Sequence, residues 1–163
     1  MSSRKYRILL VDDDEALLRG AARFIDDLGT PPGTLHAAFV RSPVAHAELR
    51  GIATEAALAL PGVRAVVTYR DAGKQRYGVS PARYDENILA IDRVRYVGDE
   101  VAAVAAVDER TAERAISLIE VEYEVLPAVF DENEAISGHA PVIHDEEGME
   151  GAHDPSRNIV HHI

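Results

Sequence analysis

The chain has 163 residues, the length of one ordinary domain, and its 47% hydrophobic and 28% charged residues are a globular composition. It contains no cysteine, which excludes disulfides, thiolate metal ligands, iron–sulfur ligation and cysteine nucleophiles within it. Its net charge of −11 disfavours nucleic acid and anionic membrane surfaces as partners. No apolar run is long enough for a signal peptide or a spanning helix, so we expect a cytoplasmic protein without membrane contact.

The N-terminal segment 1–14 combines a short apolar run, ILLV, with the three aspartates Asp12 to Asp14. It resembles the first strand and acidic turn of a response-regulator receiver domain, where carboxylates hold Mg²⁺. A receiver also needs a phosphorylated aspartate after its third strand, but positions 50–60 (RGIATEAALAL) contain none. The receiver therefore stays a remote alternative to a solvated acidic turn or helix start.

From residue 35 onward, short strand patterns alternate with short helix patterns. LHAAFV at 35–40 and RAVVTY at 64–69 predict strands, and the Ala- and Leu-rich segment 54–60 predicts a helix that a following Pro-Gly pair ends. The next segment, 71–93, shows no sustained period and is interrupted by glycine and proline. We expect it to be a long excursion with at most short strands.

The clearest pattern spans residues 101–125. The run VAAVAAV at 101–107 is typical of a strand covered on both faces, and Asp108 after it is a good helix N-cap. One apolar stripe predicts the helix that follows, formed by Ala112, Ala115, Ile116 and Ile119. EVEYEV at 120–125 then alternates, which predicts a strand with glutamates facing water and an inward row of Val121, Tyr123 and Val125.

These patterns together predict an α+β fold with a mixed sheet and helices packed mainly on one face. Residues 131–154 carry eight acidic side chains and no Lys or Arg, so most of the negative charge lies in this segment. We therefore divide the chain into a receiver-like segment 1–14, a body 15–130 and an acidic, loop-rich tail 131–163 docked on the body.

No sequence motif indicates a reactive centre. The motifs HExxH, GxSxG, GxGxxG and the Walker phosphate loop are all missing from the chain. Asp99 and Glu100 are acid–base candidates by residue type, but a polar turn is the simpler interpretation. The histidines are His36 in a predicted strand, His46 after a turn, and His139, His144, His153, His161 and His162 in the tail. The terminal pair suits only adventitious metal, and we assign no catalytic, cofactor-binding or metal-ligating residue.

Several phrases in colinear order carry a family resemblance. They are LLRGAARFIDDL (17–28), PGTLHAAFVRSPVAHAEL (32–49), ALPGVRAVVTYRDA (59–72), VRYVGDEVAAVAAVDERTAERAISLIEVEYEVLPAVFD (94–131), HAPVIHDEEG (139–148) and NIVHHI (158–163). Together they resemble the N-terminal α/β hammerhead domain of molybdenum-hydroxylase large subunits. That family includes xanthine dehydrogenase, aldehyde oxidase, carbon monoxide dehydrogenase and 4-hydroxybenzoyl-CoA reductase.

The resemblance implies an α/β hammerhead that packs against the domains or subunits binding molybdopterin, iron–sulfur clusters and FAD in the complete oxidoreductase. In the family, the catalytic glutamate lies after the point where this chain ends, so no catalytic residue is carried over. The matching positions are carried over as fold or interface positions: Phe24, Asp26, Arg41, Ser42, His46 and Gly98. The alternative is a non-enzymatic, engineered or chimeric hammerhead scaffold that self-associates as a homo-oligomer.

The sequence departs from the family in one turn. Glu100 stands where the family usually has proline after Gly98 and Asp99. Because proline restricts the backbone, we expect this turn to be less rigid here.

Overall fold

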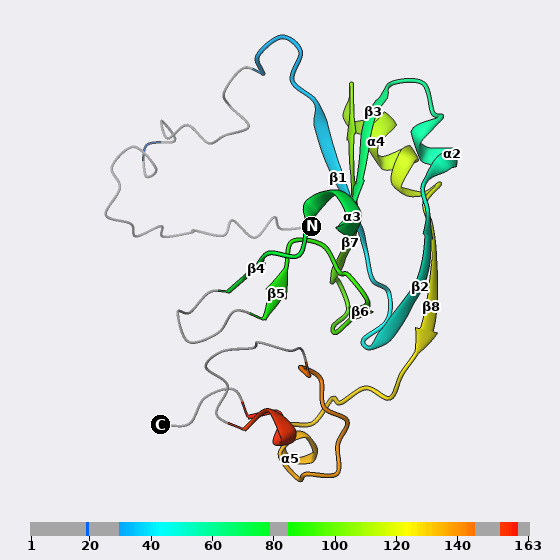
Figure 1. The fold of residues 1–163 in the computed structure, drawn as a ribbon. Coiled ribbons are helices and arrows are strands. Elements are labelled where there is room, and N and C mark those ends of the chain that lie inside the picture. The colour runs from blue at the N-terminus through cyan, green and yellow to red at the C-terminus, as the bar shows by residue number, and fades with distance from the viewer. Residues whose placement is uncertain (1–18, 20–29, 79–84, 146–153, 160–163) are drawn as a thin grey trace, which may run out of the picture. The chain divides into compact units, whose positions relative to one another are not determined.

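The computed structural model describes Arg19 and residues 30–78, 85–145 and 154–159 (Figure 1). The chain divides into two units, Met1–Thr34 and Leu35–Ile163. The described part of the first unit contains a turn in which the Thr34 N–H donates to the Pro31 carbonyl at 3.2 Å. All the helices and strands described below belong to the second unit. The receiver-like segment 1–14, with Phe24 and Asp26, lies outside the described residues.

The described strands form three separate sheets (Figure 1). Sheet A has the order β1 (His36–Arg41), β7 (Glu100–Ala106) and β3 (Val63–Thr68). Sheet B has the order β6 (Arg93–Val94), β2 (Ala47–Ala53) and β8 (Glu120–Val125). The two short strands β4 (Arg76–Tyr77) and β5 (Glu86–Asn87) pair with each other inside the excursion.

The described residues form the short helices α2 (Glu55–Leu58), α3 (Tyr69–Ala72), α4 (Glu109–Ile116), α5 (Glu132–Ala135) and the 3-10 helix η2 (Pro155–Arg157). Helix α4 packs against all three strands of sheet A, and α2 packs against β3 and α4. Both lie on the same side of sheet A (Figure 1), which confirms the prediction that the helices pack mainly on one face. Within the described ranges, no helix is long and apolar enough to cross a membrane.

The α+β class is confirmed, but the single mixed sheet predicted from the sequence is wrong in detail. Every strand pairing among the described residues is antiparallel. A strand–helix–strand unit makes a parallel pair only when both strands join the same sheet. Here each unit divides its strands between sheets: β2 and β8 lie in sheet B, whereas β3 and β7 lie in sheet A.

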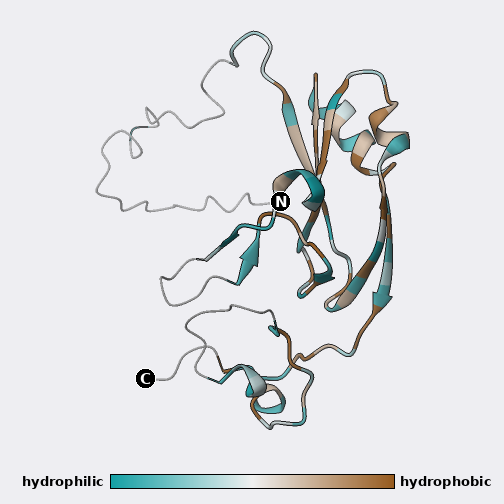
Figure 2. Cartoon of the chain, in the orientation of Figure 1, coloured by the Kyte–Doolittle hydropathy of each residue, from teal (hydrophilic) through white to brown (hydrophobic). Residues whose placement is uncertain are grey.

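The hydrophobic core has two adjoining clusters. One lies between sheet A and the helices and contains Ala57, Ala102, Val104, Ala115 and Ile119. The other lies toward sheet B and contains Ala47, Ala90, Val94 and Val101. Val40, Ile52 and Val121 contact both clusters, so sheets A and B share one continuous core. Figure 2 shows hydrophobic residues along the strands of sheets A and B, and hydrophilic residues on β4 and β5.

Most of the predicted elements appear where the patterns placed them. Asp108 caps α4, accepting a hydrogen bond from the Thr111 N–H at 2.7 Å, and the predicted apolar stripe faces the core. Val125 is an exception, because its side chain is 67% exposed although the alternation placed it inward. It is the last residue of β8, opposite Ala47 at the start of β2, where the core ends.

The described part of the tail is organised around Asn158. The Asn158 side chain accepts from the Ile143 N–H at 2.9 Å and donates to the carbonyls of Ala135 and Pro141. Its backbone φ of 56° lies in the left-handed region, which asparagine tolerates better than most residues. These bonds tie α5 to the segment 141–145, which in turn contacts the excursion.

Candidate functional site

A polar corner joins the turn after β1 to the turn before β7. The Ser42 N–H donates to the Asp99 carbonyl at 2.8 Å, and the Gly98 N–H donates to the Ser42 carbonyl at 2.8 Å. The Ser42 hydroxyl donates to the Val44 carbonyl at 2.7 Å. Gly98 has a φ of +102°, which explains a glycine at this point of the turn. The structure therefore brings together two of the family-matching positions, Ser42 and Gly98.

Arg41 reinforces the same corner from β1. Its guanidinium donates to the Gly98 carbonyl at 2.9 Å and pairs with the Glu100 carboxylate at 2.6 Å. The Tyr96 hydroxyl lies 3.4 Å from the other Glu100 oxygen. Glu100 thus supplies this turn with a carboxylate that a proline would lack. The lower rigidity predicted for this turn stays a prediction.

His46 is a buried structural residue of this corner. Its side chain is 4% exposed, and its Nδ1 lies 2.7 Å from the Pro127 carbonyl. Because a carbonyl only accepts, Nδ1 carries the proton in this contact. The Leu126 N–H donates to the His46 carbonyl at 2.9 Å. His46 therefore anchors the end of β8 to the start of β2.

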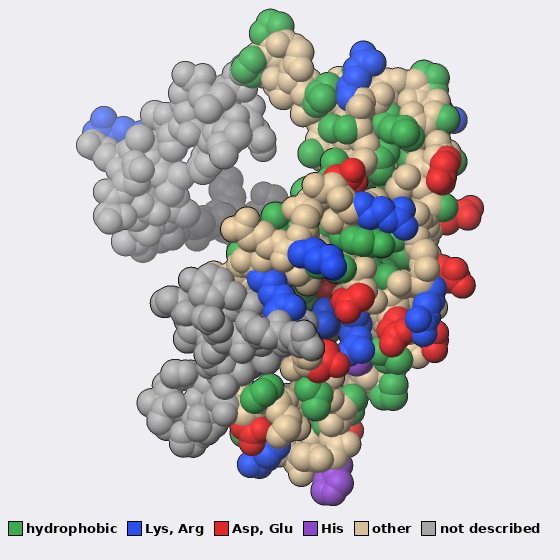
Figure 3. Space-filling view, in the orientation of Figure 1, with side chains coloured by type: hydrophobic (Ala, Val, Ile, Leu, Met, Phe, Trp, Pro, Cys, Tyr) green, Lys and Arg blue, Asp and Glu red, His purple; other side chains and the backbone are tan. Residues whose placement is uncertain are grey.

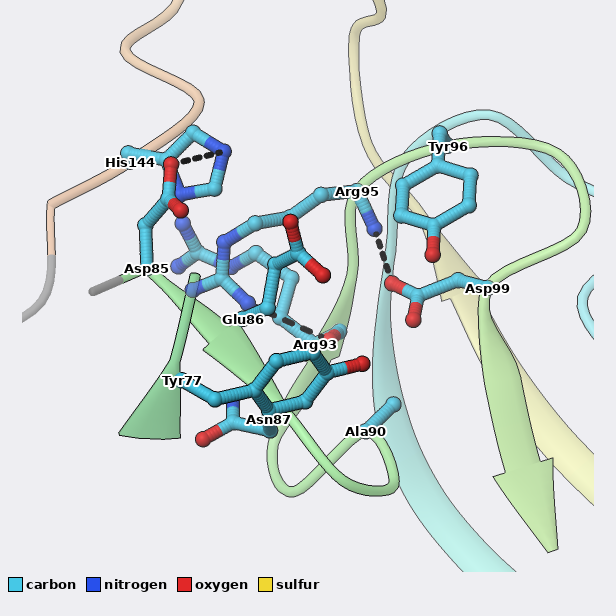
Figure 4. Close-up of a pocket in the computed structure, with 10 residues that line it drawn as sticks. All are labelled: Tyr77, Asp85, Glu86, Asn87, Ala90, Arg93, Arg95, Tyr96, Asp99 and His144. Atoms are coloured by element: carbon cyan, nitrogen blue, oxygen red, sulfur yellow. Dashed lines mark hydrogen bonds and ion pairs between the residues drawn. The ribbon is translucent and has the colours of Figure 1, made fainter. Parts of the chain in front are cut away.

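A polar pocket of about 260 Å³ opens beside the corner (Figure 4). Its walls come from the excursion, from the turn before β7 and from the tail. Its lining residues are Tyr77, Asp85, Glu86, Asn87, Ala90, Arg93, Arg95, Tyr96, Asp99 and His144. Asp85 and Arg95 are largely buried, with side chains 5% and 7% exposed, and His144 Nε2 lies 4.0 Å from Asp85 Oδ2.

The electrostatics of the pocket keep its phenols protonated. Burial, followed by the carboxylates of Asp99 and Glu100, raises the pKa of Tyr96 to about 12. Burial also raises the pKa of Tyr77. The pKa of Asp99 is raised by burial as well, against the opposing hydrogen bond from the Arg95 N–H at 2.9 Å. Near neutral pH, Tyr96 and Tyr77 are therefore hydrogen-bond donors rather than bases.

The donor set of the described residues does not fit the cofactors that the resemblance implies. They contain no group of three His, Cys, Asp or Glu side chains that could hold a metal ion. The chain also lacks the cysteines that iron–sulfur clusters need. His36 lies exposed on β1 and His139 is exposed in the tail, while His153, His161 and His162 lie outside the described residues.

Sequence reasoning identified Asp99 but missed most of the other residues that line the pocket. Tyr77 and Arg93 come from the excursion, where no periodic pattern assigned them a face, and Arg95 comes from the turn before β7. Arg95 Nε donates to the Ile143 carbonyl at 3.0 Å, a contact across 48 positions that no local signal reveals.

Comparison with known proteins identifies the family. The family model described as "Aldehyde oxidase and xanthine dehydrogenase, a/b hammerhead domain" matches residues 19–127. The chain belongs to this family. The hammerhead chain is 35% identical to the carbon monoxide dehydrogenase large chain of Hydrogenophaga pseudoflava over 153 residues, 91% of this chain and 19% of that protein. It is 37% identical to the xanthine dehydrogenase molybdenum-binding subunit of Escherichia coli O157:H7 over 142 residues, which are 82% of this chain and 19% of that subunit.

Solved structures agree with this assignment. The aldehyde oxidoreductase of Desulfovibrio gigas superimposes with a TM-score of 0.71 at 36% identity, covering 80% of the hammerhead chain and 15% of that enzyme. A copper- and molybdenum-containing CO dehydrogenase superimposes with a TM-score of 0.69 at 36% identity, and the match covers 85% of the hammerhead chain and 18% of that protein. The hammerhead chain spans about a fifth of the length of the curated relatives it matches.

Proposed function

We propose that this chain is the hammerhead part of a molybdenum-dependent hydroxylase or dehydrogenase large subunit, with a packing and subunit-contact role. The family match over residues 19–127 carries the proposal, because relatives named as large or molybdenum-binding subunits are about five times longer. In such an enzyme, molybdopterin, iron–sulfur clusters and FAD would be bound by other domains or subunits. We propose residues 15–130 as the domain proper and 131–163 as its tail.

The pocket beside the corner supports a role without a reactive centre in this chain. Two of its lining residues are engaged with their neighbours: Asp99 accepts a hydrogen bond from the Arg95 backbone N–H at 2.9 Å, and the Tyr96 hydroxyl lies 3.4 Å from the Glu100 carboxylate. A nucleophile with an adjacent base is not formed by the residues lining it. The Ala90 N–H donates to the Glu100 carbonyl at 2.7 Å, which ties the excursion to the start of β7.

Exposed apolar side chains support the contact role. Phe130 is 85% exposed, Val125 67% and Val97 64%. Phe39 and Ile88, about half exposed, line a shallow groove with Tyr77. Side chains of this kind are usually covered by a neighbour in larger assemblies. These surfaces suit either the remaining domains of a large subunit or a second copy of the chain.

Cofactor analysis of the purified chain tests the proposal. We expect less than stoichiometric molybdenum and no substrate-dependent dye reduction with purines, aldehydes or CO. Stoichiometric molybdenum with dye reduction by the chain alone would contradict it. Light scattering tests the alternative of a self-associating scaffold. A chain that stays monomeric at all concentrations argues against this alternative, whereas a stable dimer favours it.

A further inference from the structure

Strand β8 lies at an edge of sheet B. It pairs with β2, and within the described ranges no strand lies on its other side (Figure 1). The Leu126 N–H donates to the His46 carbonyl at 2.9 Å, which fixes how the backbone groups alternate along the strand. The backbone groups of Tyr123 and Val125 therefore point away from β2, toward the outer edge. Outside the ladder with β2, neither backbone forms a hydrogen bond with a described residue.

The side chains on the solvent face of β8 are all glutamates. Glu120, Glu122 and Glu124 are exposed, and Figure 3 shows acidic side chains along the side of the molecule where Figure 1 places β8, with Lys and Arg side chains among them. Arg50 of β2 pairs with both Glu124 and Glu48 at 2.6 Å. Glu120 and Glu122 form no ion pair with a residue that the structure describes. The unpaired carboxylates therefore lie at the start and middle of the edge strand.

A shallow groove adjoins these two carboxylates. Glu55 and Arg70 are the other charged residues that line it, and its floor includes Gly51. The Glu122 carboxylate leans over this glycine, since a Cβ built there would lie 3.6 Å from Glu122 Oε2. The Arg70 guanidinium lies 5.4 Å from the ring centroid of Tyr69. The groove therefore offers space and carboxylate oxygens to the head of a long cationic side chain.

A second copy of β8 does not suit this edge. Residues directly opposite each other in an antiparallel pair share a face, so two copies with their apolar rows on one face would set glutamate opposite glutamate. The glutamates would form the closer, non-hydrogen-bonded pairs of the new ladder, with Cα atoms about 4.5 Å apart. Like charges at that spacing destabilise the pairing.

We propose that the outer edge of β8 receives an extended strand of a partner protein by antiparallel pairing. The partner strand carries Lys or Arg opposite Glu120 and Glu122, with aliphatic residues between them. Its backbone pairs with the outward-facing groups of Tyr123 and Val125, and its cations neutralise the carboxylates that have no partner in the described part of this chain.

Hydrogen exchange with a model strand tests the pairing. The heptapeptide TKVKVKT, acetylated and amidated, should bind the full chain at millimolar concentration. Near saturation it should slow the exchange of the Tyr123 and Val125 amides about tenfold. The Glu124 amide, which already points to β2, should change little and serves as the internal control. Unchanged exchange at both Tyr123 and Val125 overturns the proposal.

Two control peptides separate strand pairing from charge attraction alone. TEVEVET keeps the apolar residues but reverses the charges, and TKVKVKT methylated at alternate backbone nitrogens keeps the charges but loses donors. Both should bind far more weakly than TKVKVKT in NMR titrations, and equal binding by either one overturns the proposal.

A charge variant of the chain tests the role of the glutamates. Glu122→Gln should weaken TKVKVKT binding about threefold, the size expected for one cross-strand pair of opposite charges. Glu113→Gln removes the same charge from an exposed position of α4 and should leave the affinity unchanged. Equal affinities for the two variants overturn the pairing of these charges.

This inference deepens the proposed contact role and rests on it, because it names one surface and the chemistry of the partner that covers it. The two can fail separately. Stoichiometric molybdenum with dye reduction by this chain alone would contradict the proposed role, and the exchange of the β8 amides does not enter that measurement. Unprotected β8 amides overturn the inference and leave the result of the cofactor analysis as it is.

Discussion

The sheet A half of the body and the polar corner with its tail are held together by different forces. Sheet A packs Ala102 and Val104 against Ala115 of α4, all at 1% exposure or less. The corner and tail rely on ion pairs and hydrogen bonds, such as Arg41–Glu100 and Arg93–Asp145. Salt does not screen the burial of apolar side chains, whereas partly exposed ion pairs weaken as salt screens them. The apolar core of sheet A therefore sets the stability of the chain, and the polar corner with its tail sets the shape of the sites.

The largest effect should come from a charge placed in the sheet A core. Val104→Asp puts an unpaired carboxylate at a position that is 1% exposed, and should lower the free energy of unfolding by about 4 kcal/mol. Urea denaturation measures it. Val125→Asp is the matched control, since Val125 is 67% exposed and should lose less than about 0.5 kcal/mol. Equal losses for the two variants would contradict the placement of the core.

The turn before β3 should give the next largest effect. Gly62 has a φ of +98°, and an added Cβ would lie 3.1 Å from both Thr111 Cγ2 and Val107 Cγ2. Gly62→Ala should therefore lower the free energy of unfolding by about 2 kcal/mol. Gly138→Ala has a φ of +79° but open space around it, so it should lose only about 1 kcal/mol. The difference between the variants isolates the contact with the start of α4.

The N-cap of α4 should show a pH-dependent effect. The backbone and side chain of Thr111 hydrogen-bond to the Asp108 carboxylate and hold its pKa below the usual value. A lowered folded-state pKa means that the stabilisation is present above the unfolded-state pKa and is lost as pH falls through the folded value. Asp108→Ala should thus be less stable than wild type at pH 7, with the difference shrinking below about pH 4. Asp108→Asn still caps the helix, and its thermal melts should lack this pH dependence.

The smallest effect should appear at the polar corner. Glu100→Gln removes one of the carboxylates that, after burial, raise the pKa of Tyr96 to about 12. The pKa of Tyr96 should fall but stay above that of an exposed tyrosine, because burial and Asp99 remain. NMR titration of ¹³C-labelled tyrosine measures the change, with Glu122→Gln on β8 as the control. An unchanged Tyr96 titration would contradict the contact between Tyr96 and Glu100.

The sequence alone determined the elements that have a strong local cause. The run VAAVAAV became β7, Asp108 became an N-cap, and the described part of the excursion at 71–93 holds the end of α3 and short strands. The colinear phrases also indicate the family, and the family model over 19–127 agrees. Periodicity, capping and turn chemistry act over a few residues, so the chain itself displays them.

Only the tertiary structure decided which strands pair and which charges meet. The antiparallel pairing of β7 with β1 and β3, the exposure of Val125 and the seat of Asp145 against Arg93 all join residues far apart in the chain. No local pattern records such pairings, because their free energy depends on the burial and the distances that the whole fold creates. The polar pocket therefore forms only when the excursion, the turn before β7 and the tail come together.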